Sequence, residues 1–79
     1  MNEEWKPFSA GVAKGFIFSS FLESVLFMAE LSSMASGIKY ELIREPLMHG
    51  VRVRVKKEEA ETVSEKIDEL YLQIRKHNL

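Results

Sequence analysis

The sequence predicts a small α+β domain, a two-layer sandwich in which two helices cover one face of an antiparallel hairpin. Three observations predict it: two stretches alternate apolar and polar residues, a long stretch repeats apolar residues at a helical period, and a serine-led capping pattern opens a second apolar helix. The 79 residues suffice for one domain. We divide it into a leader segment over residues 1–14 and a core over residues 15–76.

The first element of the core admits two interpretations. An apolar run from Phe16 to Phe18, between a glycine and a serine, favours a short buried strand over residues 15–19. The alternative is a long N-terminal helix over residues 9–34, which would give an α-β-β-α order. Two interior glycines and apolar residues around its whole circumference argue against that helix.

A helix is expected next, from Phe21 to about Ala35. Ser20 is its N-cap, and Glu23 three residues later completes a capping box. We expect its core stripe to contain Phe21, Leu22, Val25, Leu26, Met28 and Ala29. We place Phe27, Leu31 and Met34 on a second side.

Two alternating stretches, residues 38–43 and 51–56, predict a hairpin with a loose loop of about five to seven residues. Pro46 and Gly50 interrupt the pattern between them. Pairing would bring Glu41 close to Arg52 or Arg54 and so support the register. The core side of the hairpin is expected to hold Ile38, Tyr40, Leu42, Val51, Val53 and Val55, and the other side to hold Arg52, Arg54 and Lys56.

The last element is an amphipathic helix over residues 57–76. Acidic residues in its first turn and basic residues in its last turn complement the helix dipole. The resulting order is β-α-β-β-α, a ferredoxin-like core without its last strand. The single apolar stripe of this helix consists of Ala60, Val63, Ile67, Leu70 and Ile74.

Four short segments mark this layout: Gly15-Phe16-Ile17-Phe18-Ser19-Ser20, Ser36-Gly37-Ile38, Gly50-Val51-Arg52-Val53-Arg54-Val55 and Glu58-Glu59-Ala60. With these segments the chain resembles small prokaryotic signal-transducing modules with a ferredoxin-like βαββα core and, more distantly, PII-like regulators. The resemblance implies a regulatory or scaffolding role by analogy with those modules. A related group of sulfur-carrier-like proteins relies on cysteines, which this chain lacks, so that chemistry does not carry over.

The short chain indicates self-association. A domain of this length buries a marginal core, the absence of cysteine excludes disulfides, and two distant histidines, His49 and His77, argue against a structural zinc. A homo-oligomer, in the first place a dimer, is the remaining way to enlarge the core, and the hydrophobic content of 46% suits it. The expected interface residues are Trp5, Phe8, Phe16, Phe27, Leu31, Met34 and Tyr71.

The charge balance bears on partners and location. Eleven basic and twelve acidic residues give a net charge of −1, which argues against nucleic acid as a partner. An acidic N-terminus and polar residues within the most apolar stretch, residues 16–34, favour a cytoplasmic protein without a membrane segment.

The basic strand and the loop before it form the candidate ligand site. It contains Glu45, His49, Gly50, Arg52 and Arg54, which suit a small anion or a nucleotide. Sheets that bind RNA add exposed aromatic side chains, and the outward positions of the predicted strands carry none.

These residues offer no nucleophile beside a base, so we expect no catalytic residue, no metal and no cofactor. The predicted function is a non-enzymatic oligomerising module with a structural or regulatory role. A ligand-binding regulatory domain and an RNA- or DNA-binding domain that uses the basic strand are the alternatives.

Overall fold

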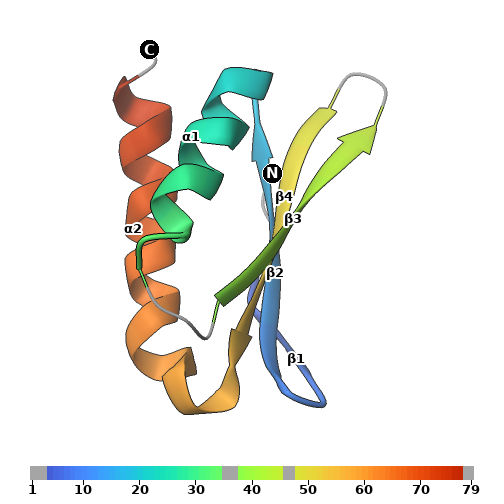
Figure 1. Ribbon diagram of the computed structural model, residues 1–79, viewed down its shortest axis with the longest axis vertical. Helices are drawn as coiled ribbons and strands as arrows, with labels where there is room; N and C mark the ends of the chain where they lie inside the picture. Colours follow the sequence, from blue (N-terminus) through green and yellow to red (C-terminus); the bar gives the residue numbers. More distant parts are fainter. Residues whose placement is uncertain (1–3, 35–37, 46–47, 78–79) are drawn as a thin grey trace.

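A computed structural model describes residues 4–34, 38–45 and 48–77, with the side chains of residues 44, 45, 48 and 77 left out. The chain forms an α+β domain with a four-stranded antiparallel sheet and two helices (Figure 1). Its elements are β1 (Lys6–Phe8), β2 (Gly11–Phe18), α1 (Phe21–Leu31), β3 (Ile38–Glu45), β4 (Met48–Lys56), a 3₁₀ turn (Lys57–Glu59) and α2 (Ala60–His77).

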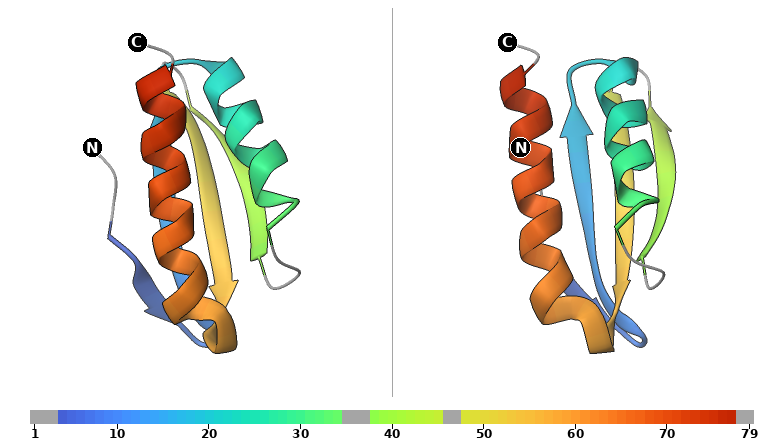
Figure 2. Two further views of the ribbon diagram at one scale, coloured as in Figure 1. Left: turned by 90° about the vertical axis from the view of Figure 1, so that its left-hand side faces the viewer. Right: turned by 60° about the vertical axis from the view of Figure 1, so that its left-hand side comes forward.

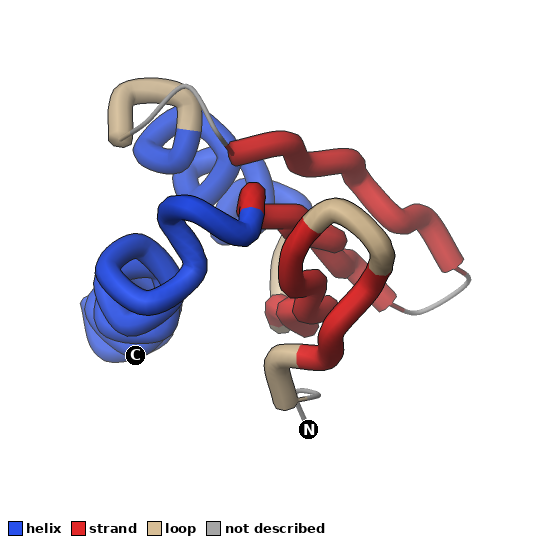
Figure 3. Tube along the Cα trace, turned by 90° about the horizontal axis from the view of Figure 1, so that it is seen from below, coloured by secondary structure: helices blue, strands red, loops and turns tan. Residues whose placement is uncertain are grey.

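The strands lie in the order β1-β2-β4-β3, and each pair of neighbours is antiparallel. Both helices lie on the same face of this sheet and leave the other face uncovered (Figures 2 and 3). The valines of β4 point towards the helices and are fully buried. The two-layer arrangement with two helices on one face therefore agrees with the prediction.

An N-terminal hairpin is the main departure from the predicted fold. Residues 6–18 form β1 and β2, joined by a turn at Ser9 and Ala10, where we expected a leader and a strand over 15–19. The alternative long helix over residues 9–34 is wrong. Because β1 precedes the predicted elements, the ferredoxin-like β-α-β-β-α order is not confirmed.

Proline and glycine are uncommon inside β-strands, but the positions of Pro7 and Gly11 in this hairpin accommodate them. Pro7 cannot donate a ladder hydrogen bond, but β1 is an edge strand, where proline is tolerated. A side chain at Gly11 would overlap the carbonyl oxygen of Val55, so the close approach of β2 to the end of β4 needs a glycine there.

The second hairpin is longer and tighter than predicted. Its strands extend to Glu45 and begin again at Met48, and these two residues pair with each other. The expected loose loop of five to seven residues is therefore wrong, because the ladder continues through most of it. The expected proximity of Glu41 to Arg54 is confirmed, with 3.8 Å between their side-chain atoms.

The orientation of α1 is the opposite of the predicted one. Its inward side carries Ser24, Phe27 and Leu31, each with no exposed surface. Spacing of three and four residues places these three on one stripe, and the small Ser24 lets the helix approach the sheet. The expected core residues Phe21, Leu22, Val25 and Leu26 are instead exposed.

A buried carboxylate, that of Glu23, lies on the inward side at the start of α1. Ser20 Oγ accepts a hydrogen bond from the Glu23 backbone N–H (3.2 Å), as the capping pattern predicts. Glu23 Oε1 accepts hydrogen bonds from the Ser19 N–H (2.9 Å) and hydroxyl (2.7 Å). Burial alone would raise the pKa of Glu23, but these hydrogen bonds and the positive charge of Arg75 outweigh it and lower that pKa.

The amphipathic helix α2 packs as predicted, with Val63, Ile67 and Ile74 buried. It also covers the edge of β2 that β1 does not reach. Tyr71 donates a hydrogen bond through its hydroxyl (2.8 Å) to the Ile17 carbonyl oxygen, and Arg75 donates a second (3.2 Å). An edge carbonyl is thus satisfied within the chain rather than by another strand.

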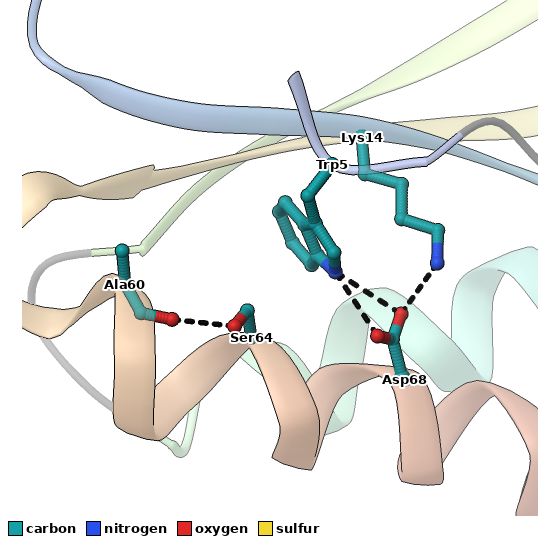
Figure 4. Close-up of polar contacts among 5 residues, drawn as sticks. All are labelled: Trp5, Lys14, Ala60, Ser64 and Asp68. Carbon is teal, nitrogen blue, oxygen red and sulfur yellow. Dashed lines mark hydrogen bonds and ion pairs between the residues drawn. The ribbon is translucent and has the colours of Figure 1, made fainter. Parts of the chain in front are cut away.

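The N-terminal hairpin is fastened to α2 by an aspartate (Figure 4). The Trp5 indole N–H donates to both carboxylate oxygens of Asp68, at 3.2 Å to Oδ1 and 3.1 Å to Oδ2. Lys14 Nζ forms an ion pair with Asp68 Oδ1 at 2.6 Å. The Trp5 ring also meets Phe16 edge-on, with 6.0 Å between centroids. These contacts hold β1 against β2 and so position the side chains on the uncovered face.

Candidate functional site

The uncovered face of the sheet is the candidate functional site. Directly paired residues point to the same face, so the ladder orders its side chains in rows across the strands. The first row is Phe8, Gly11 and Lys56, and the second is Lys6, Ala13, Arg54 and Lys39. The third row is Gly15, Arg52 and Glu41, and the fourth is Ile17, Gly50 and Ile43.

Small residues on β2 leave a trough between β1 and β4. Two hollows of about 350 and 360 Å³ lie on this face, and both are lined by Phe8 and Arg54. One also has Lys39 and Lys56 in its lining, and the other Lys6 and Arg52. Each hollow thus combines an aromatic ring with cationic side chains.

The charge on this face is strongly positive, although the whole chain carries −1. Across the described rows, five cations face a single carboxylate, that of Glu41. The Arg54–Glu41 pair is long at 3.8 Å, and its side chains are 47% and 56% exposed, so it contributes little to stability. The remaining cations are Lys6, Lys39, Arg52 and Lys56, none of which forms an ion pair with any other described residue.

The structure brings only part of the predicted ligand site together. Arg52 and Arg54 lie side by side in adjacent rows of the uncovered face. His49 pairs with Phe18 and its ring lies 6.2 Å from that of Phe21, so it points to the helix side, away from both arginines. The side chain of Glu45 lies outside the described residues.

Gly50 lies on the uncovered face but lines neither of the two hollows described above. A Cβ atom there would lie 3.3 Å from the Phe16 carbonyl oxygen and 3.4–3.5 Å from the side chains of Ile17 and Ile43. Gly50 therefore fills a close-packed apolar end of the sheet, and the site opens towards the other end.

The ligand site predicted from the sequence does not include Lys6, Phe8 or Lys39, and Phe8 is expected only as an interface residue. Lys6 and Phe8 were assigned to the leader, although their spacing of two residues would have placed them on one face of a strand. Lys39 is an outward residue of the alternating stretch 38–43, but its place opposite Arg54 depends on the register of β3 and β4.

The predicted interface residues fall mainly inside the chain. Phe16, Phe27 and Leu31 have no exposed surface, because they form the core between α1, α2 and the sheet. Trp5 is half-buried against Asp68 and docks on its own domain, while Met34 and Tyr71 pack against the core. Phe8, at 39% exposure, is the one member of the set that protrudes on the uncovered face.

Within the described ranges, no group of three metal-binding side chains comes together. Neither of the described helices has the length and apolar character needed to cross a membrane. Comparison of the chain with family models, curated proteins and solved structures gives no match. The resemblance to signal-transducing and PII-like modules stays a prediction, and the function is inferred from the geometry alone.

Proposed function

We propose that this protein is a non-enzymatic binding module whose uncovered sheet face takes a phosphate-bearing anion. The observation that supports it best is the set of five cations facing one carboxylate around two shallow hollows. Concentrating one sign of charge in a hollow raises the local concentration of an oppositely charged ligand.

The two arginines suit phosphate particularly well. A guanidinium offers several N–H donors in a planar fork that matches two oxygens of a phosphate group. Among the described residues, Arg54 forms an ion pair only with Glu41, through a long contact to an exposed side chain, and a phosphate oxygen can replace that carboxylate at small cost.

Calorimetric titration with tripolyphosphate tests this proposal. Binding should weaken as salt is raised, and Arg52→Ala with Arg54→Ala should lower the affinity at least tenfold. The matched control is Lys66→Ala with Lys76→Ala, which removes the same charge from the exposed side of α2. Equal losses in the two double variants, or no binding by the parent chain, would contradict the proposal.

A second function, self-association through α1, is favoured by a separate observation. Phe21, Leu22, Val25 and Leu26 form an exposed apolar stripe, with Leu22 at 61% exposure. A helix that is apolar on both sides normally has both sides covered. The stripe contains no charged residue, so a second copy related by a two-fold axis would bring apolar groups together without like charges.

Light scattering during size-exclusion chromatography tests this second proposal. The parent chain should run as a dimer, and Leu22→Glu should convert it to a monomer with unchanged circular dichroism. Leu72→Glu is the control, because Leu72 on α2 is as exposed, at 64%, and lies outside the stripe. Weak interfaces assemble at concentrations of roughly 100 micromolar. A parent chain that stays monomeric at that concentration would refute the dimer.

A further inference from the structure

We infer that the ligand of the uncovered face is a single-stranded nucleic acid, with a base stacked on Phe8 and its phosphates on the neighbouring cations. This inference rests on the proposed anion-binding function and names the chemical class of its ligand. It follows from three properties of the face: the spacing of the cations, the position of one aromatic ring and the shape of the floor.

The cations repeat along the strand direction. Arg52, Arg54 and Lys56 occupy alternate positions of β4, so consecutive charges lie about 6–7 Å apart along the sheet. Lys6 and Lys39 extend the middle row to both sides of Arg54. A linear polyanion can contact such a row at several points, whereas a single phosphate group uses only one or two of them.

Phe8 supplies an exposed aromatic ring, which a simple anion would not need. It is a large aromatic side chain, 39% exposed, on a strand whose other uncovered neighbour is Lys6. It lines both hollows, so a flat ring could lie against it from either one while the adjoining phosphates reach Arg54 and Lys56. Stacking of bases on aromatic rings combined with a basic groove is the usual mode of single-strand recognition.

The floor of the site also favours a flat ligand. The positions of β2 beside Phe8 and Lys6 are Gly11 and Ala13, and neither raises a bulky side chain between β1 and β4. A base in a duplex is already stacked on its neighbours and cannot lie against Phe8. A single strand presents its bases freely, so the face should prefer single strands to duplexes.

Fluorescence anisotropy with labelled eight-nucleotide oligomers tests the inference. The probes are octauridylate, octathymidylate, an abasic phosphodiester octamer of the same charge, and a duplex of the same length. The two base-containing single strands should bind about fivefold or more tightly than the abasic octamer and the duplex. Similar affinity for octauridylate and octathymidylate would show that the face recognises the bases and phosphates that both strands share. A preference for one of them would identify RNA or DNA as the ligand.

Variants separate the ring from the charges. Phe8→Leu should lower the affinity for the base-containing oligomers to that of the abasic octamer and leave the abasic octamer unaffected, and Phe8→Trp should restore the difference. Arg54→Ala should weaken both kinds of oligomer and reduce the slope of log affinity against log salt by about 0.7. Trp5 is the only tryptophan, so unchanged tryptophan emission shows that the Phe8→Leu and Arg54→Ala variants keep their fold.

Two results would overturn the inference, and they differ in what they leave standing. Equal binding of abasic and base-containing oligomers, or no effect of Phe8→Leu, refutes stacking while the anion-binding function survives. Failure of all four oligomers and of tripolyphosphate to bind refutes both.

Discussion

The two faces of the same sheet are built from adjacent residues of the same strands, yet they serve opposite purposes. On β4, Val51, Val53 and Val55 are fully buried under the helices, while Arg52 and Arg54 between them lie exposed on the other side. On the helix side, aromatic rings pack together, and Tyr71 and Arg75 donate hydrogen bonds to the Ile17 carbonyl oxygen. The uncovered side holds cations that nothing in the described part of the chain neutralises, apart from the weak contact to Glu41.

The difference shows how a small chain can assign stability and binding to separate surfaces. Phe16 contacts Phe27 and Tyr71 at centroid distances of 4.9 and 5.2 Å, so its loss would open the core. Phe8 lies one strand away on the opposite face, and no other aromatic ring of the described residues packs against it. Substitutions on the two faces should therefore separate into those that unfold the chain and those that change only its binding.

The largest effect is expected at Phe16. Phe16→Ala should lower the free energy of unfolding by about 3–5 kcal/mol, because it leaves a cavity where several rings meet. Phe8→Ala, the matched change on the uncovered face, should cost about 1 kcal/mol or less. Urea unfolding followed by circular dichroism measures both, and equal losses would remove the distinction between the faces.

A smaller effect is expected where the N-terminal hairpin meets α2. Asp68→Ala should cost about 1–2 kcal/mol, since it removes the acceptor for Trp5 and Lys14 at a half-exposed position. The emission of Trp5 should shift to longer wavelength as its indole becomes hydrated. Glu69→Ala, an exposed neighbour on α2, is the control and should leave both stability and emission unchanged.

Glu23 should make the stability depend on pH. Its pKa in the folded chain is lowered, so its contribution is present above the unfolded pKa and is lost as the pH falls below about 4.5. Glu23→Gln should cost about 1 kcal/mol at pH 7 and flatten this acid loss. Thermal unfolding between pH 3 and 7 measures the profile, and identical profiles for the two chains would contradict the assignment.

The smallest change in stability is expected for the cations of the uncovered face. Arg52→Ala should alter the free energy of unfolding by less than about 0.5 kcal/mol, because the side chain is exposed and has no ion pair with another described residue. The same variant should lose affinity for tripolyphosphate. A large loss of stability, measured by urea unfolding, would show that Arg52 serves the fold instead.

The sequence predicts the parts of this molecule whose period is unambiguous. The stripe of α2, the alternation of β4 and the Ser20 cap follow from local residues, and the structure confirms them. The orientation of α1 could not be predicted in the same way, because apolar residues surround it, and its inward side is the one whose Phe27 and Leu31 pack into the core of the folded chain.

Half of the candidate site was equally out of reach. Arg52 and Arg54 are visible as outward residues of an alternating strand, whereas Phe8 and Lys6 reach the same face only because β1 pairs with β2. Pro7 and the Ser9–Ala10 turn give that hairpin no strong local signal. Pairing between segments far apart in sequence is what creates the aromatic and basic surface.

The most direct test of the binding face is a titration of isotopically labelled protein with octauridylate, followed by two-dimensional amide NMR. The account predicts that shifts concentrate on β1 and on alternate residues of β4, including Phe8, Arg52 and Arg54, while the outer side of α2 stays unchanged. Shifts confined to the helices, or no shifts at all, would contradict the claim that the uncovered face of the sheet binds the ligand.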